Sequence, residues 1–320
     1  MRIFVSGSLA YDRIMDFPGR FVDHILPEKI HILNVCFMVN GLTERFGGTA
    51  GNIAYNLALL GEHPVILATA GRDFGPYREW LGRLGLPLTG IKEIPQEFTA
   101  GAYITTDLSD NQITGFNPGA MKYTSDYRFD GLESAAALAI VAPGGLEDML
   151  IYTRFYKDRG VGYIFDPGQS IPAWDSPELR EMATGALALI VNDYELEMFR
   201  QKTGLDEAGL LALTPHLITT QGEKGSVVRT DLGVDEVPAV PARQVLDPTG
   251  AGDAYRAGLL KGLALSLGWP TAARMGAVLA SFSVEQQGTQ EHHLENSEFW
   301  QRYAENFGAP PAAALSRSLP

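Results

Sequence analysis

The chain has 320 residues, of which 45% are hydrophobic and 20% are charged, a composition typical of a globular protein with a sizeable core and not of a disordered one. The formal net charge of −13, with no block of Lys and Arg, predicts that neither nucleic acid nor an anionic membrane surface is a partner. The single cysteine, Cys36, excludes an internal disulfide. No apolar run approaches the roughly 18 residues that span a bilayer, and no signal-peptide pattern follows Met1. We therefore expect a cytoplasmic protein.

Short apolar runs alternate with longer amphipathic ones along the chain. Strands are predicted over residues 2–7, 65–71, 138–143, 162–167 and 187–193, because each run is too short for a helix and ends in Gly, Pro or Asp. Helices are predicted over 50–61, 76–85, 146–160 and 194–204, each of which ends in glycine. This order predicts a three-layer α/β/α fold with a mostly parallel sheet, which binds ligands beyond the carboxyl ends of its strands.

Two segments interrupt this alternation. Residues 12–46 and 98–117 are rich in β-formers without intervening helices, and strands are expected over 31–39, 99–107 and 111–116. We expect them to form a small β-sheet lid that excludes water from a ligand bound on the core, and through which a homodimer could form. The predicted core comprises residues 1–11, 47–97 and 118–308, and a flexible tail is predicted over 309–320.

The stretch DPTGAGDAYRAGLL, residues 247–260, places three small residues before an acid at the start of a predicted helix. The N–H groups of Gly250, Ala251 and Gly252 are unobstructed and have no partner within a helix, so they can form an anion hole for a phosphate group. Asp253 could then accept a proton from a hydroxyl that attacks the phosphorus. An Asp at a helix start is more often a cap, and the residues alone leave both roles open.

Other short motifs give no alternative site. A Walker loop ends in Gly-Lys followed by Ser or Thr, whereas Gly222 is followed by Glu-Lys-Gly-Ser, and the dinucleotide fingerprint requires a glycine where Tyr255 stands. The adjacent His292 and His293 lack both the i, i+4 spacing of metal ligands and a matched cysteine. We expect these histidines at the surface or at the rim of a bound nucleotide.

The stretch over 247–260 resembles the second signature of the ribokinase-like (pfkB) family of sugar and nucleoside kinases. Further segments are similar to family motifs in the expected order: GSLAYDRI over 7–14, RFGGTAGNIAYNLALLG over 45–61, NDYEL over 192–196 and TTQGEKGS over 219–226. The resemblance implies a ribokinase-like fold and transfer of the γ-phosphoryl group of ATP to an alcohol. Within the family, the lid segments FPGRF over 17–21 and FNPGAM over 116–121 look most like those of bacterial adenosine kinases.

The resemblance also implies a role for each motif residue. Asp253 is the general base, and Gly250, Ala251 and Gly252 form the anion hole. The acceptor is expected at Asp12, which can accept two hydrogen bonds from a diol, and at Gly47, Gly48 and Asn52. The nucleotide is expected at Asn192, Thr220, Gly222, Gly225 and Thr249, and Glu195 is expected to hold Mg²⁺ through water. On the residues alone, each position has an ordinary alternative as a loop cap, a turn residue or a first-turn glutamate.

A purine base requires flat partners, and stacking on an aromatic ring contributes about 1 to 3 kcal/mol per base. Tyr103 and Phe116 of the lid are the predicted stacking residues, although either ring could instead pack the lid against the core. Gln169 is predicted to hydrogen-bond the edge of the purine.

The expected function is therefore an ATP-dependent adenosine kinase that acts on the ribose 5′-hydroxyl and uses Mg²⁺, with a requirement for K⁺ left open. Two alternatives also remain open: a ribokinase-like sugar kinase, and a non-catalytic nucleoside-binding protein on the same scaffold. In each case the predicted partners are small molecules.

Overall fold

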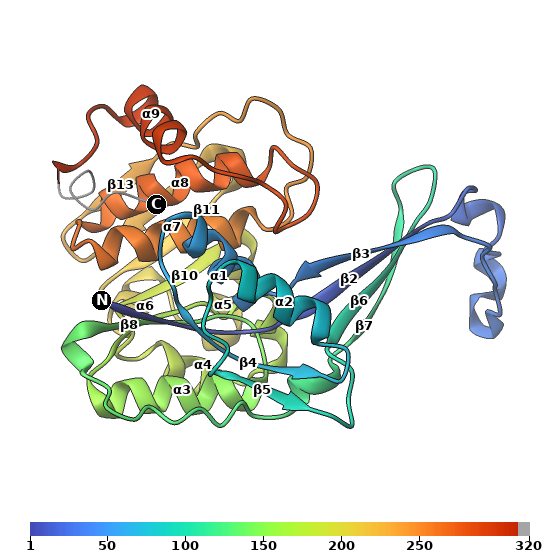
Figure 1. The fold of residues 1–320 in the computed structure, drawn as a ribbon, viewed down its shortest axis with the longest axis horizontal. Helices are drawn as coiled ribbons and strands as arrows, with labels where there is room; N and C mark the ends of the chain where they lie inside the picture. The colour runs from blue at the N-terminus through green and yellow to red at the C-terminus, as the bar shows by residue number, and fades with distance from the viewer. Residues whose placement is uncertain (313–320) are drawn as a thin grey trace.

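The computed structural model describes residues 1–312, and a nine-stranded sheet forms the centre of the molecule (Figure 1). Its strands lie in the order β13 (Val234–Val237), β12 (Ser226–Arg229), β11 (Leu217–Thr220), β10 (Ala188–Asn192), β9 (Gly162–Phe165), β8 (Ala137–Val141), β1 (Arg2–Ser6), β4 (Val65–Gly71) and β5 (Ile91–Ile94). Neighbours from β11 to β5 are parallel, and β12 and β13 are antiparallel additions at one edge.

Helices cover both faces of this sheet because its strands are apolar on both faces. In β1, Ile3 and Val5 belong to one buried core and Phe4 belongs to the other. The first core also holds α1 (Thr49–Leu59), α2 (Gly75–Arg83), α7 (Ala251–Ala264), α8 (Trp269–Ser283) and α9 (Asn296–Phe307). The second holds α3 (Leu146–Arg159), α4 (Ser176–Ala183), α5 (Asp193–Thr203) and α6 (Glu207–Leu211). The predicted three-layer α/β/α fold is confirmed.

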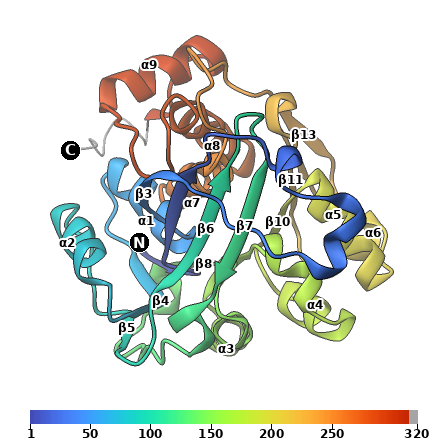
Figure 2. The same ribbon diagram turned by 90° about the vertical axis from the view of Figure 1, so that its right-hand side faces the viewer.

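A second sheet extends away from one side of the core (Figure 1) and lies in front of it in Figure 2. Its four strands are ordered β3 (Asn40–Gly47), β2 (Ala10–Asp16), β6 (Ala100–Thr106) and β7 (Gln112–Asn117). The pair β2 and β6 is parallel and the other two pairs are antiparallel. This sheet corresponds to the predicted lid, with β2 beginning at Ala10 and β3 ending at Gly47.

Short 3₁₀ helices connect these elements: η1 (Phe21–Asp23), η2 (Pro27–Ile32), η3 (Gly119–Lys122), η4 (Ser134–Ala136), η5 (Gly168–Ala173) and η6 (Gly222–Lys224). The strand predicted over 31–39 is wrong, because η2 covers its start and no strand follows before Asn40. The reason is register: the last residue of β2, Asp16, pairs with Asn40, so residues 31–39 lie beyond the end of their neighbour.

Two further sequence predictions concern membrane association and the tail. Among residues 1–312, every helix is too short or too polar to cross a lipid bilayer. Most of the tail predicted over 309–320 lies outside the described residues, which end at 312.

Candidate active site

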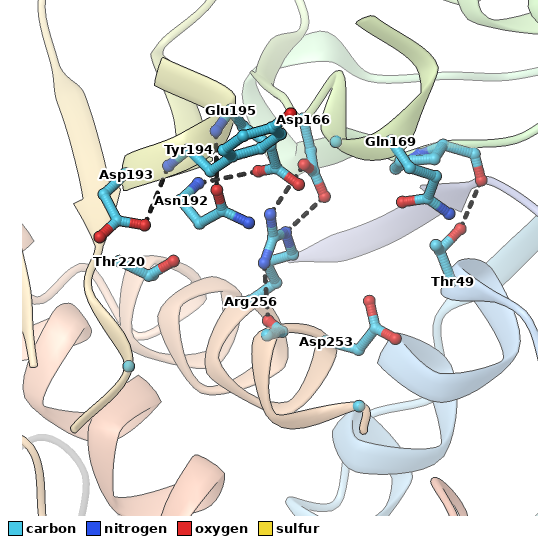
Figure 3. A pocket seen from close by; sticks show the side chains of 15 residues that line it. Thr49, Asp166, Gln169, Asn192, Asp193, Tyr194, Glu195, Thr220, Asp253 and Arg256 are labelled. Atoms are coloured by element: carbon cyan, nitrogen blue, oxygen red, sulfur yellow. Dashed lines mark hydrogen bonds and ion pairs between the residues drawn. The ribbon is translucent and has the colours of Figure 1, made fainter. Parts of the chain in front are cut away.

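A cavity of about 450 Å³ opens where β9, β10 and β11 end, facing the start of α7 (Figure 3). It lies where parallel sheets bind ligands, beyond the carboxyl ends of the strands. Its lining includes eight residues predicted from the sequence to form the site: Gln169, Asn192, Glu195, Thr220, Gly222, Gly250, Gly252 and Asp253.

The start of α7 is shaped by the glycines of the Gly-Ala-Gly-Asp run. Gly250 is the residue before the helix and has φ 80°, a left-handed conformation that glycine adopts without strain. Its carbonyl accepts the first helical bond, from the N–H of Ala254, at 2.9 Å. The N–H of Ala251 donates to the carbonyl of Pro248 at 3.3 Å, so this amide is already engaged. The first-turn N–H groups of Gly252 and Asp253 have no acceptor inside the helix and are suited to bind an anion.

The carboxylate of Asp253 lies on the first turn of α7 and lines the cavity. Its Oδ2 accepts a hydrogen bond of 2.8 Å from the side-chain amide of Asn52 on α1. Burial raises the pKa of Asp253 to about 6, although Arg256 and Asn52 act in the opposite direction. A carboxylate with this pKa is ionised at neutral pH and is more basic than an ordinary aspartate, as a general base requires.

Asn52 is the centre of a buried amide network that the sequence did not reveal. Its Oδ1 accepts a hydrogen bond of 3.1 Å from Nε2 of Gln290, and the same nitrogen donates to Tyr77 at 2.6 Å. The indole N–H of Trp80 donates to Oε1 of Gln290 at 2.9 Å. These contacts fix which end of the Asn52 amide faces Asp253.

Arg256 and Asp166 also line the cavity and were not predicted as site residues. The guanidinium donates to both carboxylate oxygens of Asp166, with Nη2 at 2.8 Å from Oδ1, and Nη1 donates to the carbonyl of Gly252 at 3.0 Å. Both side chains are buried. The available signal was a charged residue among the small and apolar residues that follow Asp253 in α7, because arginine is rarely buried without a partner.

Asp12 lies on β2, at the junction between the lid and the core. A Cβ on Gly47 would lie 2.7 Å from Oδ2 of Asp12, so only glycine permits this close approach. Burial and the charge of Asp247 raise the pKa of Asp12, while Arg45 opposes the shift. Asp247 belongs to the loop that precedes α7, and its charge acts on Asp12, although Asp12 lines neither cavity. Gly48 follows and begins the turn into α1.

The two predicted stacking residues lie on opposite faces of the lid. Asp12 is aligned with Ala102, and Ala102 with Phe116, so Phe116 shares the face of Asp12. Tyr103 is the next residue along β6 and points to the other face. There its hydroxyl accepts a hydrogen bond of 3.1 Å from Arg13. The structure therefore places Phe116 on the face of Asp12 and Tyr103 on the opposite face.

Asn192 and Glu195 form a capping box at the start of α5. Oδ1 of Asn192 accepts from the N–H of Glu195 at 2.8 Å, and Oε2 of Glu195 accepts from the N–H of Asn192 at 2.8 Å. Both side chains also line the cavity. Burial raises the pKa of Glu195. Glu195 therefore caps the helix, as the alternative interpretation expected, and also lines the cavity. One of its carboxylate oxygens is already used by the N–H of Asn192.

A second cavity, of about 540 Å³, adjoins the first and shares Thr220, Gly222 and Gly252 with it. Its walls are mostly apolar and come from the loop before α7 and from α8, including Val240, Val245, Pro248, Ala277, Ala280 and Val284. Gly225 also lines it. Thr220 is the last residue of β11, and Gly222 begins η6 in the turn to the antiparallel strand β12. The turn alternative is therefore correct for Gly222, and both residues border the two cavities.

Seven predicted site residues line neither cavity: Asp12, Gly47, Gly48, Asn52, Tyr103, Phe116 and Thr249. Thr249 is exposed, lines neither cavity, and donates its N–H to Asp247 at 2.9 Å. Gln169 is an exposed residue of η5 at the cavity rim. The surface or rim position predicted for His292 is wrong: it is 1% exposed and its Nε2 lies 2.9 Å from Oδ1 of Asn56. Burial lowers the pKa of His292 to about 4.

The donor set of the first cavity suits a hydrated magnesium ion carried by phosphates. Among residues 1–312, no group of three or more His, Cys, Asp or Glu side chains converges as a protein-only metal cage. The cavity is nevertheless lined by the carboxylates of Asp193, Glu195 and Asp253, and oxygen is the ligand that Mg²⁺ prefers. The residues present therefore fit an ion that keeps most of its water and phosphate ligands.

The model of the family described as pfkB family carbohydrate kinase matches residues 19–296. The chain belongs to this family. A relative described as a nucleoside kinase, from Methanothermobacter thermautotrophicus, is 31% identical over 284 residues, which cover 87% of this chain and 91% of that protein.

Solved structures of similar proteins agree with this assignment. The Burkholderia thailandensis nucleoside kinase in complex with inosine is 40% identical and has a TM-score of 0.85, covering 97% of this chain and 99% of that chain. The Methanocaldococcus jannaschii nucleoside kinase, a member of the ribokinase family, is 28% identical with a TM-score of 0.84, covering 95% of this chain and 99% of that chain. The predicted family and ribokinase-like fold are confirmed, and the chain is a phosphotransferase acting on a hydroxyl group.

Proposed function

We propose that this pfkB family member is a nucleoside kinase that transfers the γ-phosphoryl group of ATP to the 5′-hydroxyl of a purine nucleoside, with adenosine as the expected acceptor. One observation carries the proposal: the basic carboxylate of Asp253 lies on the first turn of α7, beside N–H groups that can bind the transferring phosphoryl group. A base and an anion hole on one helical turn are suited to in-line transfer.

In the proposed step, Asp253 accepts the proton of the 5′-hydroxyl while the hydroxyl oxygen bonds to the γ-phosphorus. The bond from that phosphorus to the bridging oxygen of ATP breaks, and ADP leaves with the bond's electron pair. The N–H groups of Gly252 and Asp253 stabilise the charge that develops on the phosphoryl oxygens. When bound, Mg²⁺ supplies positive charge to the phosphate oxygens, and Glu195 is the residue proposed to orient its waters.

The acceptor is placed by the lid. The proposed contact to the ribose diol is Asp12, which can accept two charge-assisted hydrogen bonds. Phe116, 54% exposed on the same face, is proposed to stack on the base. Gly47 allows the ribose to approach Asp12, and closure of the lid would exclude water from the transfer.

The two cavities are proposed to divide the nucleotide between them. The polar one, with Asn192, Thr220 and Gly222, suits the phosphates, and the apolar one beside Gly225 suits the base of ATP. A structure of the Burkholderia thailandensis relative in complex with ADP-inosine supports a site for a nucleotide and a nucleoside together.

A panel of acceptors tests the proposal. Purified protein is incubated with ATP and Mg²⁺, with and without K⁺, and with adenosine, inosine, guanosine, cytidine or ribose, and ADP formation is measured. We expect the highest kcat/KM with adenosine and a purine nucleoside preferred over free ribose by at least tenfold. Turnover with ribose alone would establish the sugar kinase alternative, and binding of nucleosides without turnover would contradict the kinase.

We also propose that the lid forms a homodimer in the cytoplasm. Support comes from apolar side chains exposed at its tip, including Ile30, Ile32, Leu33 and Met38. Sedimentation equilibrium measures the mass, and replacing Ile32 and Met38 by Ser should shift a dimer to the monomer without lowering its melting temperature.

A further inference from the structure

Arg256 occupies an unusual position in the first cavity. Among residues 1–312, it is the one basic residue in the lining, where it faces four carboxylates: Asp166, Asp193, Glu195 and Asp253. Its side chain is 8% exposed. A cavity with this charge balance would repel a triphosphate if Arg256 did not contribute to binding.

The hydrogen bonds of Arg256 leave part of its donor capacity free. A guanidinium has five N–H donors. Three are used by the two oxygens of Asp166 and by the carbonyl of Gly252. Figure 3 shows the guanidinium between the start of α7 and Asp166, in the space that Asn192 and Asp253 border from opposite sides. The remaining N–H groups are available to a ligand in that space.

Asp166 has a second effect, on Asp253. Arg256 is three residues after Asp253 on the same helix, a spacing at which oppositely charged side chains can pair. Asp166 forms a bidentate ion pair with the guanidinium of Arg256. This pair keeps the guanidinium from pairing with Asp253 instead. The carboxylate of Asp253, which already accepts the hydrogen bond from Asn52 at Oδ2, thereby keeps its other oxygen for a proton.

Stability alone is a weak explanation for this ion pair. Buried pairs often contribute little net stability, because desolvation of both charges offsets their attraction. A pair that lines a cavity and retains free donors is better explained by a ligand.

We propose that Arg256 is a binding residue for the phosphates of the nucleotide, held in place by Asp166, and that its free N–H groups donate to non-bridging phosphate oxygens. This inference rests on the proposed use of ATP. It makes Arg256 the fixed positive charge of the cavity and Asp166 its positioning residue.

The test is ATP affinity, measured by isothermal titration calorimetry in magnesium buffer for the wild type and three variants: Arg256→Met, Arg256→Lys, and the double variant Asp166→Asn with Arg256→Met. We expect Arg256→Met to weaken ATP binding by about 10- to 100-fold, as for loss of a charge-assisted hydrogen bond. The ATP affinity of Arg256→Lys should lie between those of the wild type and Arg256→Met, because the lysine ammonium keeps the charge and loses the planar, multidentate guanidinium. Adenosine affinity should stay within twofold in all three.

The double variant separates a ligand role from a structural one. It removes both charges together, so its melting temperature should lie closer to the wild-type value than that of Arg256→Met, while its ATP affinity should remain as low. A folded double variant that binds ATP like the wild type would overturn the inference and leave the kinase proposal intact. Failure of the wild type itself to bind ATP would overturn both. If Arg256→Met does not fold, the other two variants decide the question.

Discussion

The side-chain amide of Asn52 donates a 2.8 Å hydrogen bond to the carboxylate of Asp253, although the two residues are 201 positions apart in the chain. The contact joins the start of α1 to the start of α7. It therefore links the segment that ends the lid to the proposed general base.

Replacing Asp253 by Asn removes the base but keeps an oxygen that can accept the hydrogen bond from Asn52. We expect the variant to fold and to bind adenosine with an affinity close to that of the wild type, with kcat lowered by roughly 10²- to 10⁴-fold, the usual contribution of a general base. Steady-state kinetics and calorimetric titration measure the two quantities. Turnover within tenfold of the wild type would remove Asp253 from this role.

The pH dependence of the reaction should report the ionisation of Asp253. Burial raises the pKa of Asp253 to about 6. Its carboxylate form is therefore lost as the pH falls through 6, and nearly all of the protein carries it above about pH 7. We expect log(kcat/KM) for adenosine to rise with unit slope below pH 6 and to level off above pH 7. A profile that is flat down to pH 5 would contradict a base with this pKa.

Gln290 should position Asn52 and, through it, Asp253. In Gln290→Leu the Asn52 amide loses its partner, so its hydrogen bond to Asp253 weakens; that bond lowers the pKa of Asp253. We expect kcat to fall about tenfold and the kinetic pKa to rise above that of the wild type. Trp80→Phe, which removes the donor to Gln290 together with part of the ring that packs against Phe46 and Tyr55, leaves Gln290 itself in place and should have a smaller effect in the same direction. A lower melting temperature with an unchanged kinetic pKa would indicate a purely structural role.

Asp12 should bind the acceptor and contribute little to the chemical step. We expect Asp12→Ala to raise the KM for adenosine by about 10- to 100-fold, as for loss of hydrogen bonds to a charged group, with a smaller change in kcat. Asp16→Ala is the matched control, because Asp16 is an exposed acid at the far end of the same strand, β2. Equal KM values for the wild type and Asp12→Ala would contradict the diol assignment.

The two faces of the lid should differ in how much they contribute to binding the nucleobase of adenosine. Phe116→Ala should weaken adenosine binding by about 1 to 3 kcal/mol and leave any weak ribose binding unchanged, because only the nucleoside has a base to stack. Tyr103→Ala is the control of similar size on the opposite face and should change adenosine affinity less than twofold. The reverse result would mean that the outer face contacts the acceptor.

The sequence by itself determined the family and the local structure of the site. Alternating strand and helix patterns predicted the parallel sheet, and the Gly250 to Asp253 run predicted an anion-binding helix start. These features are local: glycine conformation and helix-end N–H groups depend on a few consecutive residues. The same locality explains the error over 31–39, where β-forming residues lack a strand to pair with.

Only the tertiary structure decided which side chains meet. Whether Tyr103 or Phe116 faces the acceptor depends on strand register, since a shift of one residue reverses the face of every side chain. Asn52 with Gln290, and Arg256 with Asp166, are brought together from positions 238 and 90 residues apart. No local pattern specifies such partners, because the packing of the whole core sets the distance between them.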